Sequence, residues 1–118
     1  MMRAKPVVGR WIAGAILGLA ALVGAATGTP AQQAAVSITV KGHQFQPAEV
    51  HAPANKQLAI HVKNLDGAAM EFESRSLRVE KVVTAGSEGV VSVRPLAPGR
   101  YEFFDDFHQQ TRGTLVVQ

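Results

Sequence analysis

Residues 98–117 read PGRYEFFDDFHQQTRGTLVV, a Pro-Gly turn, an aromatic run, two acids and a final apolar run. Side chains alternate faces along a strand, so Tyr101, Phe103 and Asp105 are expected on one face. A tyrosine just after such a turn is where Greek-key sandwiches often fold the side chain back onto the backbone. If the aromatic rings are core, Asp105 points inward and needs a partner, because a lone buried carboxylate is costly.

Short runs with turn signals between them continue this pattern upstream. Their even spacing and alternating apolar residues are typical of antiparallel strands. The sequence therefore predicts an all-β fold, a Greek-key β-sandwich of seven to eight strands. The expected strand segments are 36–42, 45–55 (interrupted by prolines), 57–64, 78–86, 89–96, 100–106 and 114–118.

The N-terminus has the order of a secretory signal peptide. Basic residues come first, and then an uncharged apolar run from Trp11 to Ala26 that is shorter than the roughly 20 residues of a membrane span. Small residues follow, and we expect cleavage after Ala31. Residues 1–31 are thus predicted to be the signal and residues 32–118 one domain in the periplasm. The alternative is an uncleaved anchor, which would be the protein's only contact with the membrane.

Charge and cysteine content exclude several functions. The chain has 12 Lys and Arg and 9 Asp and Glu. Three of the basic residues lie in residues 1–31, which leaves the domain balanced, so we expect no nucleic-acid partner. The absence of cysteine excludes disulfides and thiolate chemistry. It also excludes a type 1 copper centre, which requires a thiolate beside two histidines.

The C-terminal stretch resembles the last two strands of a cupredoxin. In that family a Pro-Gly-x-Tyr-x-Phe sequence leads to a cysteine, a histidine, a methionine and a glycine-led final strand. Asp105 stands at the cysteine position and His108 at the histidine position, whereas the methionine is missing. Upstream, Asn64 matches the usual asparagine, and Met70 or Glu71 stands where the first histidine would be.

The similarity is closest to the iron-uptake branch of the superfamily, the EfeO-type and FtrB-like periplasmic domains. It rests on Phe45 with Pro47, the EFES segment 71–74, Glu80 with Lys81, and FFDDF at 103–107. The resemblance implies a periplasmic accessory of ferrous-iron uptake that binds or oxidises iron, with copper as a further candidate. Its implied partners are an iron permease or other periplasmic components of that system.

Around the positions where a cupredoxin holds its copper, this sequence has an oxygen-rich set of side chains with one imidazole. Such donors suit iron or manganese better than copper(I), and carboxylates favour the trivalent state of iron. We expect three direct metal ligands and three acids beside them or at a neighbouring ion. The expected ligands are Glu71, Asp105 and His108, and the accompanying acids are Glu73, Asp106 and Glu80.

A metal-free Greek-key adaptor or structural domain is the alternative. In that case the acids would be engaged by Arg and Lys, Glu71 and Glu73 would simply be solvated beside Phe72, and Glu80 would form a surface pair with Lys81. No hydrolase signature is present, since no serine has a nucleophile-elbow setting and no HExxH helix exists. Oxidation of ferrous iron is the enzymatic activity that the sequence leaves open.

Three residues near the expected site carry predictions about their exposure or position. His43 is expected to be solvated, although its position near Phe45 would allow it to approach the site across a neighbouring strand. His108 is expected in a loop after the inward acid. Phe104 alternates with Phe103 and is expected on the outer face as an exposed aromatic.

Overall fold

The computed structural model describes residues 33–118, which form nine strands. The predicted signal peptide lies outside the described residues. No helix that could cross a membrane occurs in the described range. The strands are β1 (Ala34–Lys41), β2 (Gln44–Gln46), β3 (Glu49–Ala52), β4 (Leu58–Asn64), β5 (Met70–Ser74), β6 (Val79–Val83), β7 (Glu88–Val93), β8 (Gly99–Asp105) and β9 (His108–Val117).

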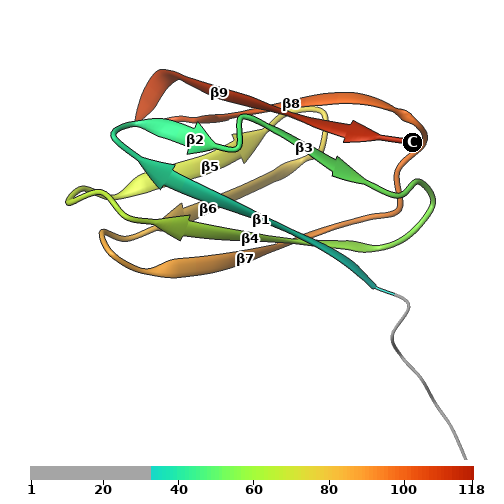
Figure 1. The fold of residues 1–118 in the computed structure, drawn as a ribbon, viewed down its shortest axis with the longest axis horizontal. Coiled ribbons are helices and arrows are strands. Elements are labelled where there is room, and N and C mark those ends of the chain that lie inside the picture. The colour runs from blue at the N-terminus through green and yellow to red at the C-terminus, as the bar shows by residue number, and fades with distance from the viewer. Residues whose placement is uncertain (1–32) are drawn as a thin grey trace, which may run out of the picture. The chain divides into compact units, whose positions relative to one another are not determined.

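The strands form two sheets that face each other as a sandwich (Figure 1). One sheet has the order β2-β1-β4-β7 and the other β3-β9-β8-β5-β6. β1 pairs in parallel with β4 and β3 in parallel with β9, and the other pairs are antiparallel. The all-β sandwich prediction is confirmed, with nine strands instead of seven or eight. The expected run 45–55 divides around Pro47 into β2 and β3, and residues 70–74 form the additional strand β5.

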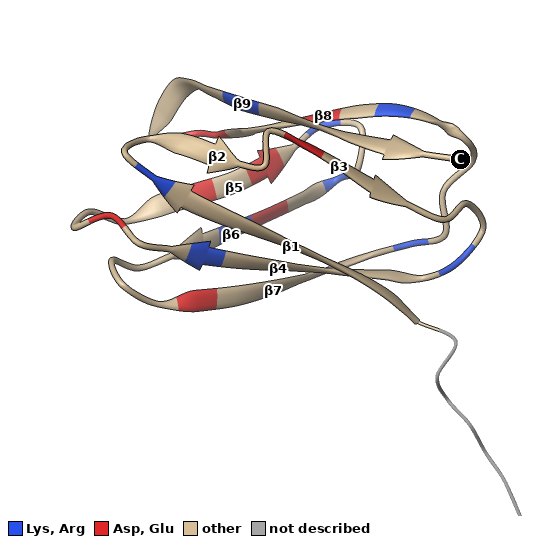
Figure 2. Ribbon diagram, in the orientation of Figure 1, with Lys and Arg blue, Asp and Glu red and all other residues tan. Residues whose placement is uncertain are grey.

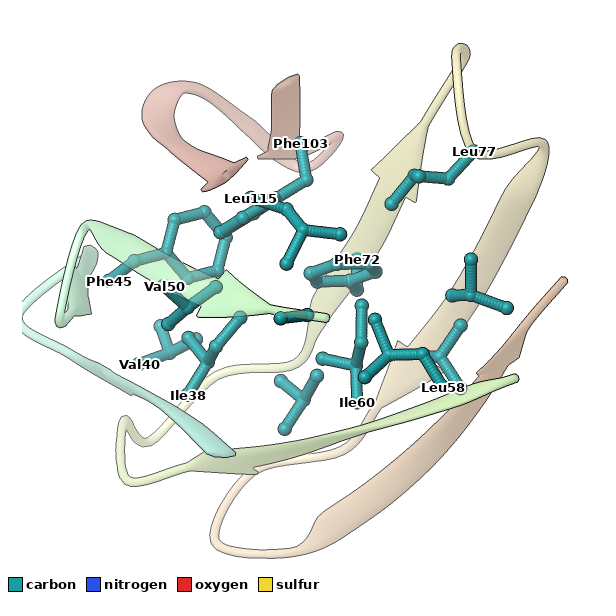
Figure 3. Packing of buried hydrophobic residues seen from close by; sticks show 14 of the residues in the cluster. Ile38, Val40, Phe45, Val50, Leu58, Ile60, Phe72, Leu77, Phe103 and Leu115 are labelled. Carbon is teal, nitrogen blue, oxygen red and sulfur yellow. The ribbon is translucent and has the colours of Figure 1, made fainter. Parts of the chain in front are cut away.

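Three phenylalanines from both sheets meet in the core (Figure 3). The ring of Phe103 stacks on Phe72 with centroids 5.0 Å apart and meets Phe45 edge-on at 4.9 Å. Gly113 on β9 makes room for this cluster, because a Cβ there would lie 2.5 Å from the Phe103 ring. Apolar burial of this kind is the main stabilising term of a sandwich without disulfides.

Two polar side chains fix the connections around the core. The Tyr101 hydroxyl donates to the carbonyl oxygen of Ala97 at 2.7 Å, so the predicted tyrosine corner is confirmed. Asn64 is fully buried, and its amide donates to the carbonyl oxygens of Ala68 (2.8 Å) and Val83 (3.1 Å). This asparagine therefore ties the β4–β5 loop to the end of β6 and fixes where β5 begins.

The turns β1–β2, β4–β5 and β8–β9 lie at one end of the sandwich (Figure 1). At this end the β8–β9 pairing shifts register, because Phe104 pairs with Arg112 whereas Asp105 already pairs with His108. Irregular pairing of this kind re-aims side chains at the rim of a sheet. His108 is the first residue of β9, so the expectation that it lies in a loop was wrong.

Candidate metal centre

Three of the predicted site residues converge on the outer face of the five-stranded sheet. Glu71 and Glu73 come from β5 and Asp106 from the β8–β9 turn, and each offers a carboxylate oxygen within 4.8 Å of the others. All three side chains are half-buried. We call these three residues the carboxylate cluster. Figure 2 shows the acidic residues of β5 beside an acidic residue of β6.

Alternation along β5 places these acids. Met70, Phe72 and Ser74 are buried, and the two glutamates between them face outward. The next strand adds Glu80, which is the register partner of Glu73 and is exposed. Like charges directly opposite each other on neighbouring strands are destabilising. The carboxylate cluster and its neighbour Glu80 therefore carry a repulsion that a bound cation would relieve.

Backbone contacts hold the β8–β9 turn against the start of β5. The amide of Asp106 donates to the carbonyl oxygen of Glu71 at 2.8 Å, and the amide of Glu71 donates to Oδ1 of Asp105 at 2.9 Å. The Gln109 side chain donates to Oδ1 of Asp106 at 2.9 Å. These contacts place the Asp106 carboxylate beside that of Glu71, although the two residues are distant in sequence.

No lysine or arginine in residues 33–118 forms an ion pair with Glu71, Glu73, Glu80 or Asp106, whereas other acids on the same protein do form such pairs. Arg75 and Arg78 line a hollow together with Glu73 and Glu80 but remain beyond ion-pair distance. Partial burial, followed by the charges of Glu80, Asp106 and Glu73, raises the pKa of Glu71. The local field thus favours a cation.

Asp105 lies away from the carboxylate cluster. It is the register partner of Phe72, and its side chain is 1% exposed, so the predicted inward face is confirmed. Its carboxylate accepts three hydrogen bonds, from the amides of Glu71 (2.9 Å) and Phe107 (3.0 Å) and from Nδ1 of His108 (3.0 Å). The partners of the buried acid are therefore loop amides and a histidine.

His108 meets a second histidine. Its ring lies against that of His43, with centroids 4.2 Å apart and planes tilted by 35°. His43 thus approaches His108 across a neighbouring strand, which is the arrangement that the sequence allowed for His43. Asp66, which lies 3.7 Å from His43 Nδ1, was missed by sequence reasoning. Its only signal was its place in a short polar loop after an apolar strand.

Phe104 faces outward as predicted, but the expectation that it is exposed was wrong. It is only 6% exposed, because the guanidinium groups of Arg75 and Arg112 lie over its ring at 5.6 and 5.1 Å from the centroid. Long basic side chains often cover apolar surface with their stems in this way. Phe104 is therefore not available as an aromatic docking surface.

The donors of the carboxylate cluster define which ions fit. Oxygen ligands suit magnesium, calcium, manganese and oxidised iron, whereas copper(I) prefers sulfur. The cluster offers three carboxyl groups on one open face, with Glu80 able to add charge beside them. Among redox-active ions, oxygen donors of this kind suit iron or manganese better than copper(I).

The fold and the sequence together define the family to which this protein belongs. Residues 14–117 match the family model described as the cupredoxin-like domain, and the chain belongs to this family. It is a member without cysteine, with Asp105 at the end of β8 hydrogen-bonded to His108 at the start of β9.

Individual proteins are also similar to this chain. The chain is 40% identical over 83 residues to RP394 of Rickettsia prowazekii (strain Madrid E), an uncharacterized protein, and the match covers 70% of this chain and 66% of RP394. Among solved structures it is similar to the metal-binding domain of the Cu(I)-exporting P-type ATPase CopA of Streptococcus pneumoniae D39. That match has a TM-score of 0.66 at 15% identity and covers 77% of this chain and 91% of that one. Auracyanin B has a TM-score of 0.62 at 22% identity, with coverage of 78% and 92%. These two likenesses concern the fold alone.

Proposed function

We propose that this protein is an exported iron-binding accessory of a ferrous-iron uptake system, in the EfeO-type, FtrB-like branch of the cupredoxins. The observation that carries the proposal is the convergence of Glu71, Glu73 and Asp106, none of which has a basic ion-pair partner within residues 33–118. The proposed site is the carboxylate cluster, with Glu80 beside it. Asp105 positions the cluster by holding the Glu71 amide.

The carboxylate cluster favours metal binding over the adaptor alternative. An adaptor would be expected to pair its acids with Arg or Lys, as Glu49 does with Arg100 and Glu102 with Arg112, both at 3.2 Å. The cluster instead keeps like charges together and raises the pKa of Glu71. Perturbed pKa values of this kind are concentrated at functional sites.

The branch assignment is supported by the motifs and by their places in the fold. The EFES segment is β5, which supplies two of the three acids, and FFDDF spans the end of β8 and the turn that supplies the third. The N-terminal signal peptide that we predict would deliver the protein to the periplasm, where the proposed partners are an iron permease and its associated components.

The ligand charge would lower the reduction potential of an iron ion bound at this site. Carboxylates stabilise Fe³⁺ more than Fe²⁺, so a bound ferrous ion would give up one electron more readily. Copper is the other candidate ion, since the CopA domain with the similar fold is described with Cu(I).

The proposal is tested by the metal content of the exported protein. Cells that express the full chain would be grown with added iron or added copper, and the protein would be purified from the periplasmic fraction and measured by elemental analysis. We expect about one iron per protein, and loss of that iron in the Glu71→Gln/Glu73→Gln variant. The matched Glu49→Gln/Glu102→Gln variant removes two surface acids elsewhere and should retain iron. Iron-free wild-type protein after growth in added iron, or equal iron in the two variants, would overturn the proposal.

A further inference from the structure

Two histidines share one open hollow at the end of the sandwich, separate from the carboxylate cluster. His43 lies in the β1–β2 turn and His108 begins β9, and both line a hollow of about 500 Å³ together with residues 109–111. Their side chains are 53% and 37% exposed, and the rings are in contact. Two exposed imidazoles side by side are accessible to an ion from solution.

Each ring has a carboxylate at its Nδ1 atom. His108 Nδ1 lies 3.0 Å from Oδ2 of the buried Asp105, and His43 Nδ1 lies 3.7 Å from Oδ2 of Asp66. An anion on this side favours the tautomer with its proton on Nδ1, and the Nε2 lone pair is then free. Metal-binding histidines are supported by a carboxylate at the other ring nitrogen in the same manner.

The carboxylate beside His43 is itself fixed. Asp66 accepts hydrogen bonds from the amides of Gly42 (2.6 Å) and His43 (2.9 Å). These amides, with a smaller contribution from the nearby histidines, hold the pKa of Asp66 below its ordinary value. Asp66 is therefore an anion at neutral pH, although at 3.7 Å it acts on the His43 ring by charge more than by a hydrogen bond.

The turn that presents His43 is held in an uncommon conformation. His43 has a φ of 56°, in the left-handed region that residues other than glycine seldom adopt. The buried Thr111 fixes it from β9, since its hydroxyl donates to the His43 carbonyl oxygen at 2.6 Å. Backbone strain that the surroundings enforce is concentrated at ligand sites.

We propose that His43 and His108 form a two-imidazole site for a late first-row divalent metal ion, with copper(II) bound more tightly than zinc(II). Imidazole nitrogen suits these ions, and their order of affinity places copper(II) first. Asp105 and Asp66 act as positioning residues for the two rings. This site does not depend on iron binding by the carboxylate cluster, which lies on the outer face of the sheet and consists of oxygen donors.

The test is a copper(II) titration of protein purified from cells that express the full chain, after removal of metals with a chelator. We expect copper(II) to bind at neutral pH with nitrogen hyperfine structure in the EPR spectrum, and zinc(II) to compete only at higher concentration. His43→Asn and His108→Asn should each weaken copper(II) binding by about tenfold or more. Asparagine tolerates the left-handed conformation at position 43, so that variant keeps the turn.

Two controls make the test specific. His51 is also exposed and has a carboxylate partner, with Nε2 3.3 Å from Glu49, so His51→Asn should bind copper(II) as the wild type does. The Glu71→Gln/Glu73→Gln variant should lose iron and retain copper(II), which separates failure of this proposal from failure of the iron proposal. Equal copper(II) affinity in wild type, His43→Asn and His108→Asn would overturn the two-imidazole site. Loss of copper(II) in the glutamate variant alone would do the same.

Discussion

Asp105 holds Glu71 by its backbone: Oδ1 of the buried carboxylate accepts the Glu71 amide at 2.9 Å, while the Glu71 side chain points to the opposite face of the sheet. One residue expected to be a ligand therefore serves to position another. Oδ2 of the same carboxylate faces Nδ1 of His108 at 3.0 Å. Asp105 thus links the carboxylate cluster to the histidine pair through two hydrogen bonds.

Replacing Asp105 should destabilise the fold. Asp105→Ala leaves the partly buried amides of Glu71 and Phe107 without an acceptor, and we expect a loss of about 2–4 kcal/mol in the free energy of unfolding measured in urea. Asp105→Asn keeps one side-chain oxygen and should lose less. The neighbouring Asp106→Ala removes a half-buried acid that accepts one side-chain hydrogen bond but also relieves repulsion within the carboxylate cluster, so it should lose much less stability. Equal stability of Asp105→Ala and Asp106→Ala would show that the three hydrogen bonds contribute little.

The raised pKa of Glu71 predicts a pH dependence of stability for the protein in chelator. Folding raises this pKa above its ordinary value of 4.5, so between the two values the folded state binds more protons than the unfolded state. The contribution of Glu71 to stability is therefore lost as pH rises through its folded pKa. Folding lowers the pKa of Asp66 from its ordinary value of 3.8. Its contribution to stability is therefore lost only as pH falls below 3.8, which is more acidic than the range in which the Glu71 carboxyl group changes its charge.

Glu71→Gln should consequently melt at a higher temperature than wild type at neutral pH, and the difference should shrink on acidification. The measurement is a series of thermal melts between about pH 5 and 8 with chelator. Glu49→Gln removes an acid that is paired with Arg100 and should not raise the melting temperature. A Glu71→Gln protein that melts below wild type at neutral pH would mean that the Glu71 carboxylate is stabilised by its surroundings.

Gly113 should not tolerate a side chain. A Cβ at this position meets the Phe103 ring at 2.5 Å and the Ala48 carbonyl oxygen at 2.9 Å, so Gly113→Ala should cost about 1–3 kcal/mol of stability. Gly67 lies in open space, and Gly67→Ala should change stability by less than about 0.5 kcal/mol. Equilibrium unfolding of both variants provides the comparison. Equal stability would indicate that the aromatic cluster can shift to admit a methyl group.

Local patterns predicted the features that depend on neighbours in sequence. The alternation of residues 100–106 was enough to place Asp105 inward and Tyr101 at its corner, because both follow from strand geometry. The convergence of Glu71 with Asp106 requires the pairing of β5 with β8, which no local pattern specifies. The prediction that Phe104 is exposed was wrong for the same reason, since the arginines that cover its ring come from elsewhere in the chain.

Strand boundaries near the site were also difficult to predict. The two-residue turn of Asp106 and Phe107 lacks the Asn-Gly or Gly-rich signal of most tight hairpins, so His108 was not recognised as the start of a strand. β5 carries two glutamates in five residues, a composition with low strand propensity. Its buried Met70 and Phe72 outweigh that propensity in the folded protein.

Binding of ferrous iron to the carboxylate cluster tests the central claim most directly. Protein purified from cells that express the full chain would be stripped with chelator and titrated anaerobically with ferrous iron at neutral pH in a calorimeter. We expect about one iron bound by wild type and by Glu49→Gln/Glu102→Gln, and an affinity about tenfold or more weaker in Glu71→Gln/Glu73→Gln, which lacks two charged ligands. No heat of binding in wild type, or the same affinity in both double variants, would contradict an iron site at Glu71, Glu73 and Asp106.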